Sequence, residues 1–398
     1  MLSETREIPF LPPASESDLT NEALTQAIKA ESRRLGFELV GVTPAVSPPG
    51  LPQLHDWLRA GYAGEMLYLP RRSSAYEHPR HVFPSVRSVV MLAMNYRSEE
   101  PAQVAANEGR VSRYAWGTLD YHELLKNKLN QLSQFVHEQR PGCTTRGVVD
   151  TAPLLERDFA RLAGLGWFGK NTMLINTRKG SWLLLAALLV DIELVADSPH
   201  DTSHCGSCTR CLDICPTDAF PKPYVLDARK CISYLTIELK TPIPVELRED
   251  VGEWLFGCDL CQDVCPWNRK APHTNERAFQ PQSDLNPANC IALLEMTREQ
   301  FDSRFKKMPM ERPGFEGLRR NAAIVLGNHG NSSAVPALIA ALQDDSPLVR
   351  GAAAWSLGKL GGLASQLALS ERLQVDCDDH VRNEISAALA ATSAAVTP

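Results

Sequence analysis

Two cysteine runs near the middle of the chain decide how the rest of it is organised. The first reads His204-Cys205-Gly-Ser-Cys208-Thr-Arg-Cys211-Leu-Asp-Ile-Cys215-Pro216, and the second reads Cys258-Asp-Leu-Cys261-Gln-Asp-Val-Cys265-Pro266. The first run has the spacing C-x2-C-x2-C-x3-C-P. The second has one cysteine fewer, and Cys231, which lies between the two runs, brings the number to eight.

Eight thiols at this spacing predict two 4Fe–4S clusters. In two-cluster bacterial ferredoxins the fourth cysteine of such a run ligates the other cluster. This crossed rule gives one cluster the ligands Cys205, Cys208, Cys211 and Cys265, and the other Cys215, Cys231, Cys258 and Cys261. Structural zinc and disulfides are the alternatives. Zinc does not predict the Cys-Pro endings, and disulfides fit badly in a reducing cytosol.

Three further cysteines, Cys143, Cys290 and Cys377, have no partner at ligand spacing and are expected to be small buried hydrophobes.

Length and composition exclude several classes of protein. The chain has 398 residues, which predicts two to three domains. Its net charge of -6 excludes a general nucleic-acid binder, so an RNA partner would need a local basic face. The longest apolar run, Trp182 to Val190, has nine residues and is too short to cross a bilayer. The N-terminus has no signal-peptide pattern, and we expect a cytoplasmic protein.

Composition and periodicity divide the chain into five segments. A leader rich in Pro, Ser and Glu is expected to be flexible, and alternating strand and helix patterns follow it. Met173 to Ile175 and Trp182 to Val190 are predicted to form a hairpin within that second segment. The segments are a leader (1–18), an α/β domain (19–195), the cluster module (196–272), a connecting segment (273–317) and a repeat region (318–398).

The last segment repeats itself. Leu318-Arg319, Val349-Arg350 and Val381-Arg382 recur at spacings of 31 and 32 residues, and Pro336 and Pro347 are placed at helix starts. Such a period is typical of paired-helix repeats, here HEAT-like units with a short period. An alanine-rich bundle is the alternative. The predicted fold is an α/β (α+β) catalytic domain with an inserted bacterial-ferredoxin-like two-cluster module and a C-terminal HEAT-like α-solenoid.

Asp150 is the best candidate acid in the α/β domain. It follows the apolar residues Val148 and Val149, at the end of a predicted strand. Burial beside apolar surface raises the pKa of a carboxyl group, which would suit a proton donor. A helix N-cap is an equally good interpretation. His122, at the start of a predicted helix, is interpreted as a packing residue.

A glycine-rich turn follows, Gly164-Leu-Gly166-Trp-Phe-Gly169-Lys170-Asn171-Thr172. Its backbone N–H groups could hold a large cofactor. It is neither a Walker loop nor GxGxxG, and an ordinary tight turn is the alternative.

With these motifs in place, the chain resembles the epoxyqueuosine reductases, iron–sulfur and cobalamin enzymes of queuosine-tRNA maturation. The likeness covers nearly the whole chain. It is carried by the eight cysteines, the HEAT-like tail and five short stretches: Arg113-Tyr114, Asp120-Tyr121-His122, Val149 to Pro153, Gly164 to Thr172 and Cys231 to Glu238.

The resemblance implies an activity: reduction of epoxyqueuosine to queuosine in tRNA, with electrons passed through the clusters to cobalamin. Asp150 would be the proton donor, and an external low-potential donor would supply electrons to what we expect is a monomer. The expected cobalamin contacts are Arg72, Arg113, Gly166, Gly169, Lys170, Asn171, Thr172, Ser233 and Lys240. The expected basic face for tRNA comprises Arg304, Lys306, Lys307, Arg319, Arg320 and Arg350.

Two other functions stay open. Reductive dehalogenases look like the same core acting on a small molecule, although they lack the HEAT-like tail. An electron-transfer subunit that docks a partner through the tail is the other alternative.

Overall fold

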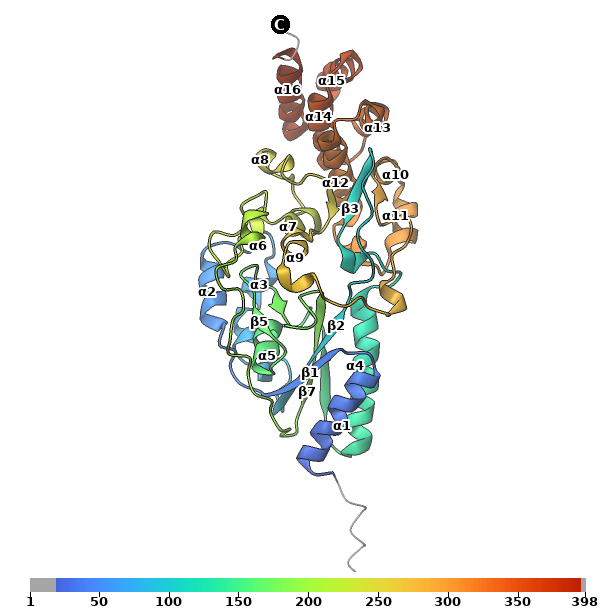
Figure 1. The fold of residues 1–398 in the computed structure, drawn as a ribbon. Coiled ribbons are helices and arrows are strands. Elements are labelled where there is room, and N and C mark those ends of the chain that lie inside the picture. Colours follow the sequence, from blue (N-terminus) through green and yellow to red (C-terminus); the bar gives the residue numbers. More distant parts are fainter. Residues whose placement is uncertain (1–18, 395–398) are drawn as a thin grey trace, which may run out of the picture.

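The computed structural model describes residues 19–394, and the predicted leader lies outside the described residues. The sheet domain occupies one end of an elongated molecule and the C-terminal helices the other (Figure 1). The short helices of the two cysteine runs lie between them. In the described part of the chain, no helix has the length and apolar character needed to cross a membrane.

A four-stranded sheet is the centre of the first domain. Its order is β1 (Leu39–Pro44), β2 (Ser88–Asn95), β7 (Leu183–Val190) and β4 (Thr145–Val148). Every neighbouring pair is antiparallel. All eight residues of β2 are buried, which explains its unbroken apolar sequence. The sheet is therefore of the α+β type, and the rule that places active groups at the carboxyl ends of parallel strands does not apply to Asp150.

Helices cover both faces of this sheet. α1 (Asn21–Arg34) and α4 (Tyr121–Gln139) lie on one face, where Leu24 and Leu125 pack with Val90. α5 (Glu156–Leu162) lies on the other face, where Phe159 packs with Met91. Figure 1 shows these helices on opposite sides of the strands. Thr20 caps α1 by accepting the N–H of Ala23.

The predicted hairpin is wrong. β6 (Leu174–Ile175) pairs with β5 (Trp167–Phe168), whereas β7 pairs with β2 and β4. A tight bridge between Asn176 and Gly180 separates β6 from β7. Two neighbouring apolar runs do not reveal which strand each one pairs with, because the pairing depends on the rest of the sheet.

A second sheet joins segments that are far apart in sequence. β3 (Glu108–Val111) lies between β8 (Trp254–Phe256), which it pairs with in parallel, and β9 (Ala288–Asn289). A strand from the predicted α/β domain thus pairs with strands from the cluster module and the connecting segment. The domain boundaries proposed from sequence stay a prediction. The short helices of this part are α2 (Leu51–Arg59), α3 (Tyr68–Arg71), α6 (Arg210–Asp213), α7 (Ile232–Ile237), α8 (Val245–Arg248) and α9 (Leu260–Asp263).

The C-terminal part is a stack of helices. α12, α14 and α16 pack successively, and both prolines predicted at helix starts, Pro336 and Pro347, lie in a first turn. A Cβ added at Gly358 would lie 2.6 Å from the Cβ of Ala388, so close packing explains this glycine. The helices are α10 (Cys290–Leu294), α11 (Arg298–Phe305), α12 (Gly314–His329), α13 (Val335–Ala341), α14 (Pro347–Leu360), α15 (Leu363–Val375) and α16 (Asp379–Ala394).

Two of the arginines predicted to face tRNA are buried instead. Arg350 pairs with Asp376 across 2.8 Å inside the helix stack. Arg320 is 1% exposed and donates hydrogen bonds to the carbonyls of Leu235, Leu239 and Thr241, at the end of α7. These side chains hold the repeats together and attach them to the cluster module. The prediction of a basic face is wrong for both.

Candidate functional site

The predicted ligands of the first cluster are neighbours in space. Burial raises the pKa of Cys265, and the thiols of Cys205 and Cys208 raise it further. Burial is the largest of the effects that raise the pKa of Cys211 to about 11. The neighbouring thiols of Cys265 and Cys205 contribute next. All eleven cysteines are free thiols in the structure.

The second predicted set is similarly grouped and more buried. The pKa values of Cys258 and Cys261 are raised first by burial and next by Cys231. Burial also raises the pKa of Cys231, which has Cys215 beside it. The N–H of Ala219 donates to the sulfur of Cys215 at 3.4 Å, a contact common around cluster sulfurs. Free thiols in two groups fit clusters chemically, although the ligand sets stay a prediction.

Within residues 19–394, no three His, Cys, Asp or Glu side chains converge as a single metal ion requires. Of the three remaining cysteines, Cys290 is buried and Cys143 is half-buried, as expected of hydrophobes, but Cys377 is exposed. The prediction is wrong for Cys377.

Asp150 lies just beyond β4, in a strained backbone conformation with a φ of 46°. Its side chain is 62% exposed. Tyr121 donates its hydroxyl to Oδ2 of Asp150 at 3.0 Å, and Nε2 of His122 lies 3.3 Å from the same oxygen. Both partners belong to the first turn of α4, which Asp120 caps. Asp150 is therefore not the N-cap of α5, whose cap residue is Leu155.

His122 connects two carboxylates. Its Nδ1 lies 2.6 Å from Asp120, and its Nε2 faces Asp150. Burial lowers the pKa of His122, but the hydrogen bonds to Asp120 and Asp150 outweigh this effect and raise the pKa to about 9. At neutral pH the imidazole is therefore protonated. Its interpretation as a packing residue missed this role, for which the Asp-Tyr-His sequence was the available signal.

The same contact reverses the pKa expected for Asp150. The hydrogen bond from His122 is the largest effect on the pKa of Asp150 and lowers it. At neutral pH the proton of this pair thus lies on His122, and Asp150 is a carboxylate. Glu156 completes the group: its Oε1 accepts the N–H of Asp150 at 2.8 Å, and burial, followed by the charge of Asp150, raises the pKa of Glu156 to about 8.

Aromatic and basic side chains surround Asp150. Arg72 donates to the carbonyl of Thr151 at 3.0 Å. The guanidinium of Arg312 pairs with Glu238 at 3.0 Å and lies 5.9 Å from the ring centre of Tyr68. Lys240 donates to the carbonyl of Arg312. Tyr68 and Arg312 gave no sequence signal, because only the fold brings them near Asp150.

The glycine-rich turn connects the cysteine runs to this region. Lys170 donates to the carbonyls of Gly206 and Cys208 at 2.8 and 2.9 Å, and Asn171 donates to the carbonyl of Cys261 at 3.2 Å. At its other end, the carbonyl of Thr172 accepts a hydrogen bond from Arg157, which follows Glu156 in α5. The turn thus bridges both cysteine runs and the helix beside Asp150.

The glycines of the turn also have a packing reason. A Cβ at Gly166 would lie 2.1 Å from the carbonyl oxygen of Ile175, and one at Gly169 would lie 2.5 Å from its Cδ1. Arg113, another predicted contact, is buried elsewhere. It pairs with Asp263 at 2.6 Å and lies 4.4 Å from the ring centre of Trp182. These residues stay predictions as cofactor contacts.

Three family models match parts of the chain. "Epoxyqueuosine reductase QueG, DUF1730" matches residues 77–151, "4Fe-4S double cluster binding domain" matches 204–268, and "HEAT repeats" matches 311–390. The epoxyqueuosine reductase of Pseudomonas aeruginosa is 43% identical over 85% of this chain and 95% of its own length. That of Escherichia coli is 38% identical over 84% of this chain and 89% of its own length.

Solved structures are similar over nearly the whole chain. One is an epoxyqueuosine reductase crystallised with an epoxyqueuosine-modified tRNA-Tyr stem loop. It has 30% identity and a TM-score of 0.87 over 93% of this chain and 99% of its own. Another, from Bacillus subtilis, has the loop of its catalytic aspartate swung out of the active site, with 30% identity and a TM-score of 0.86 over 92% of this chain and 98% of its own.

Proposed function

Because this chain belongs to the epoxyqueuosine reductase family, we propose that it reduces epoxyqueuosine to queuosine in tRNA, in the cytoplasm and as a monomer. The observation that supports this most is the arrangement of the site. A protonated His122 and Asp150 lie at an exposed position, and the turn beside them is bonded to both cysteine runs. In this proposal His122 delivers protons, and the clusters deliver electrons, to the region of Asp150.

The net reaction opens the epoxide and leaves an alkene. Both carbon–oxygen bonds break, and two electrons and two protons convert the oxygen to water. An alkoxide leaves poorly at neutral pH, so a proton must be delivered to it. In our proposal Asp150 is the residue beside the departing oxygen, and His122 holds the proton that passes through it. Asp120 orients His122, and Tyr121 fixes the carboxylate.

The residues present fit clusters and a cobalamin. The hydroxyls of Thr172 and Ser233 have no hydrogen-bond partner within the described chain, and Arg72 and Lys240 are exposed. Such donors suit the amides and phosphate of a corrinoid. When bound, the clusters and the cobalamin supply single electrons to the reaction.

The substrate base would enter beside Tyr68. This ring is 42% exposed, and aromatic rings stack on unpaired bases. Arg72 and Arg312 supply positive charge nearby for the phosphates of the RNA. Lys307 also borders the site, since its carbonyl accepts the N–H of Asp120.

Anaerobic turnover tests the proposal. The reconstituted protein, with cobalamin and dithionite, is incubated with tRNA that carries epoxyqueuosine, and the tRNA is digested for nucleoside mass spectrometry. We expect queuosine to replace epoxyqueuosine only when both reductant and corrinoid are present. Turnover of the free nucleoside or of an organohalide, but not of tRNA, would favour a small-molecule reductase. A purified protein that binds no corrinoid would favour an electron-transfer subunit.

A further inference from the structure

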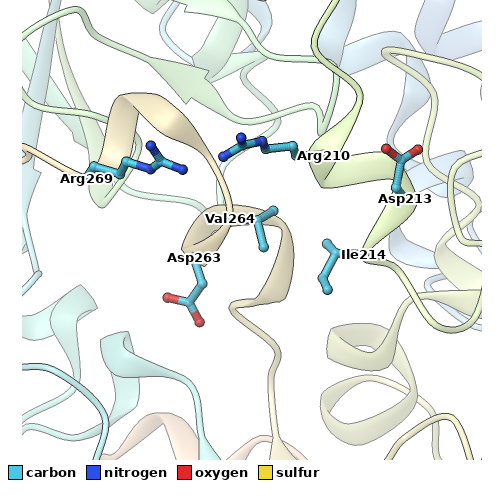
Figure 2. A pocket seen from close by; sticks show the side chains of 6 residues that line it. All are labelled: Arg210, Asp213, Ile214, Asp263, Val264 and Arg269. Atoms are coloured by element: carbon cyan, nitrogen blue, oxygen red, sulfur yellow. The ribbon is translucent and has the colours of Figure 1, made fainter.

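An open pocket of about 390 Å³ lies between α6 and α9, outside the site described above. It is lined by Arg210, Asp213, Ile214, Asp263, Val264 and Arg269 (Figure 2). Three of these residues directly precede a predicted cluster ligand: Arg210 precedes Cys211, Ile214 precedes Cys215 and Val264 precedes Cys265. The pocket therefore lies at the surface, next to predicted ligands of both clusters.

Positive charges outnumber unpaired negative ones at this pocket. In Figure 2 the guanidinium groups of Arg210 and Arg269 point toward each other across the pocket. Both arginines are exposed, and neither guanidinium group has a hydrogen bond or ion pair within residues 19–394. Of the two acids, Asp263 pairs with Arg113 at 2.6 Å, whereas Asp213 accepts only the neutral hydroxyl of Thr209 at 2.8 Å and keeps its negative charge. The adjacent Lys270 is exposed and adds a further positive charge.

The pocket also has an apolar part. Ile214 is 39% exposed and Val264 is half-buried. A small apolar centre with a charged rim is typical of transient protein interfaces, whereas an RNA backbone would not use the apolar part. The whole molecule carries a net charge of -6, so an acidic partner needs a local group of positive side chains such as this one in order to dock.

We propose that this pocket docks the electron donor, an acidic protein that carries a one-electron centre near its surface. The inference rests on the proposed function, which requires two electrons for each epoxide. Each docking event oxidises the carrier by one electron and reduces one cluster by one electron. Two events supply the pair that, with two protons, releases water from the substrate. Contacts of opposite charge would mainly raise the rate of association.

The test compares two electron sources. Arg210→Glu/Arg269→Glu is assayed on epoxyqueuosine-tRNA, once with dithionite and once with an acidic 2Fe–2S ferredoxin kept reduced by its NADPH-dependent reductase. Arg33→Glu/Arg80→Glu is the matched control, because it makes the same change in charge at exposed positions outside the pocket. We expect the pocket variant to lose about tenfold or more in kcat/KM for ferredoxin at low salt. Its dithionite-driven rate should stay within about twofold of the unsubstituted protein, and added salt should narrow the ferredoxin difference.

Each other outcome has a meaning. Equal ferredoxin kinetics for the pocket and control variants would overturn the docking proposal. A raised KM for tRNA with dithionite would overturn it too and assign the pocket to RNA. Absence of any turnover with dithionite in the unsubstituted protein would instead overturn the proposed function. If the glutamate variant loses iron, Arg210→Gln/Arg269→Gln replaces it, with a smaller loss expected for ferredoxin alone.

Discussion

Replacing Asp150 with asparagine should lower kcat for epoxyqueuosine-tRNA by about 10²- to 10⁴-fold, the range typical of general acid catalysis. Asparagine keeps the size of the side chain and can still accept a hydrogen bond from Tyr121. It cannot pass a proton from His122 to the substrate. Within residues 19–394 this side chain has no hydrogen bond or ion pair to the cysteine runs, so iron content and corrinoid absorption should not change. Single-turnover mass spectrometry with dithionite measures the loss directly.

The pH profile separates catalysis from structure in this case. Since the pKa of His122 is raised to about 9, the unsubstituted protein should lose kcat as the pH rises through that value. His122→Asn should be slow at every pH and lack this alkaline limb. The charged groups facing His122 are Asp120, Asp150 and Glu156. If Asp150→Asn loses its clusters or its corrinoid, the role of Asp150 is structural. If His122→Asn keeps the loss of kcat at alkaline pH, the titrating group is not His122.

Replacing Arg320 with alanine should destabilise the protein by about 3–5 kcal/mol, since a buried charged hydrogen-bonding group and its volume are lost together. Arg320 is 1% exposed, and burial lowers its pKa to about 10, so it stays charged at neutral pH. Its removal leaves the carbonyls at the end of α7 without donors. The melting midpoint of the anaerobic holoprotein should fall by at least about 5 °C.

An exposed arginine provides the control for this change. Arg298 is 48% exposed and pairs with Glu316 on the surface, so Arg298→Ala should cost less than about 1 kcal/mol. Because α7 begins directly after Cys231, Arg320→Ala should also release iron at a lower temperature than the control. Equal midpoints for the two variants would show that the repeats are not attached through Arg320.

Patterns among neighbouring residues predicted those features that depend only on residues close together in the sequence. The cysteine spacing reveals the two runs, and the spacing of 31 and 32 residues reveals the helical repeats at the C-terminal end. Pro336 and Pro347 mark helix starts because proline is tolerated only in the first turn. None of these predictions needed long-range information.

Long-range contacts determine what the sequence did not reveal. The antiparallel order of the sheet depends on which distant strands meet. Arg320 and Arg350 looked like surface charges, since arginine is rarely buried, yet carbonyls and Asp376 provide partners inside the fold. The sequence pointed to Asp150 but not to its protonation state, because the hydrogen bond from His122 lowers its pKa.

Iron, sulfide and zinc analysis of the anaerobically purified protein tests the central claim most directly. The claim is that eight thiols hold a pair of 4Fe–4S clusters that supply electrons to the region of Asp150. Two clusters with four irons each predict about eight irons and eight sulfides per chain, and no zinc. Stoichiometric zinc, or only about four irons with all eight cysteines reduced and intact, would contradict the account.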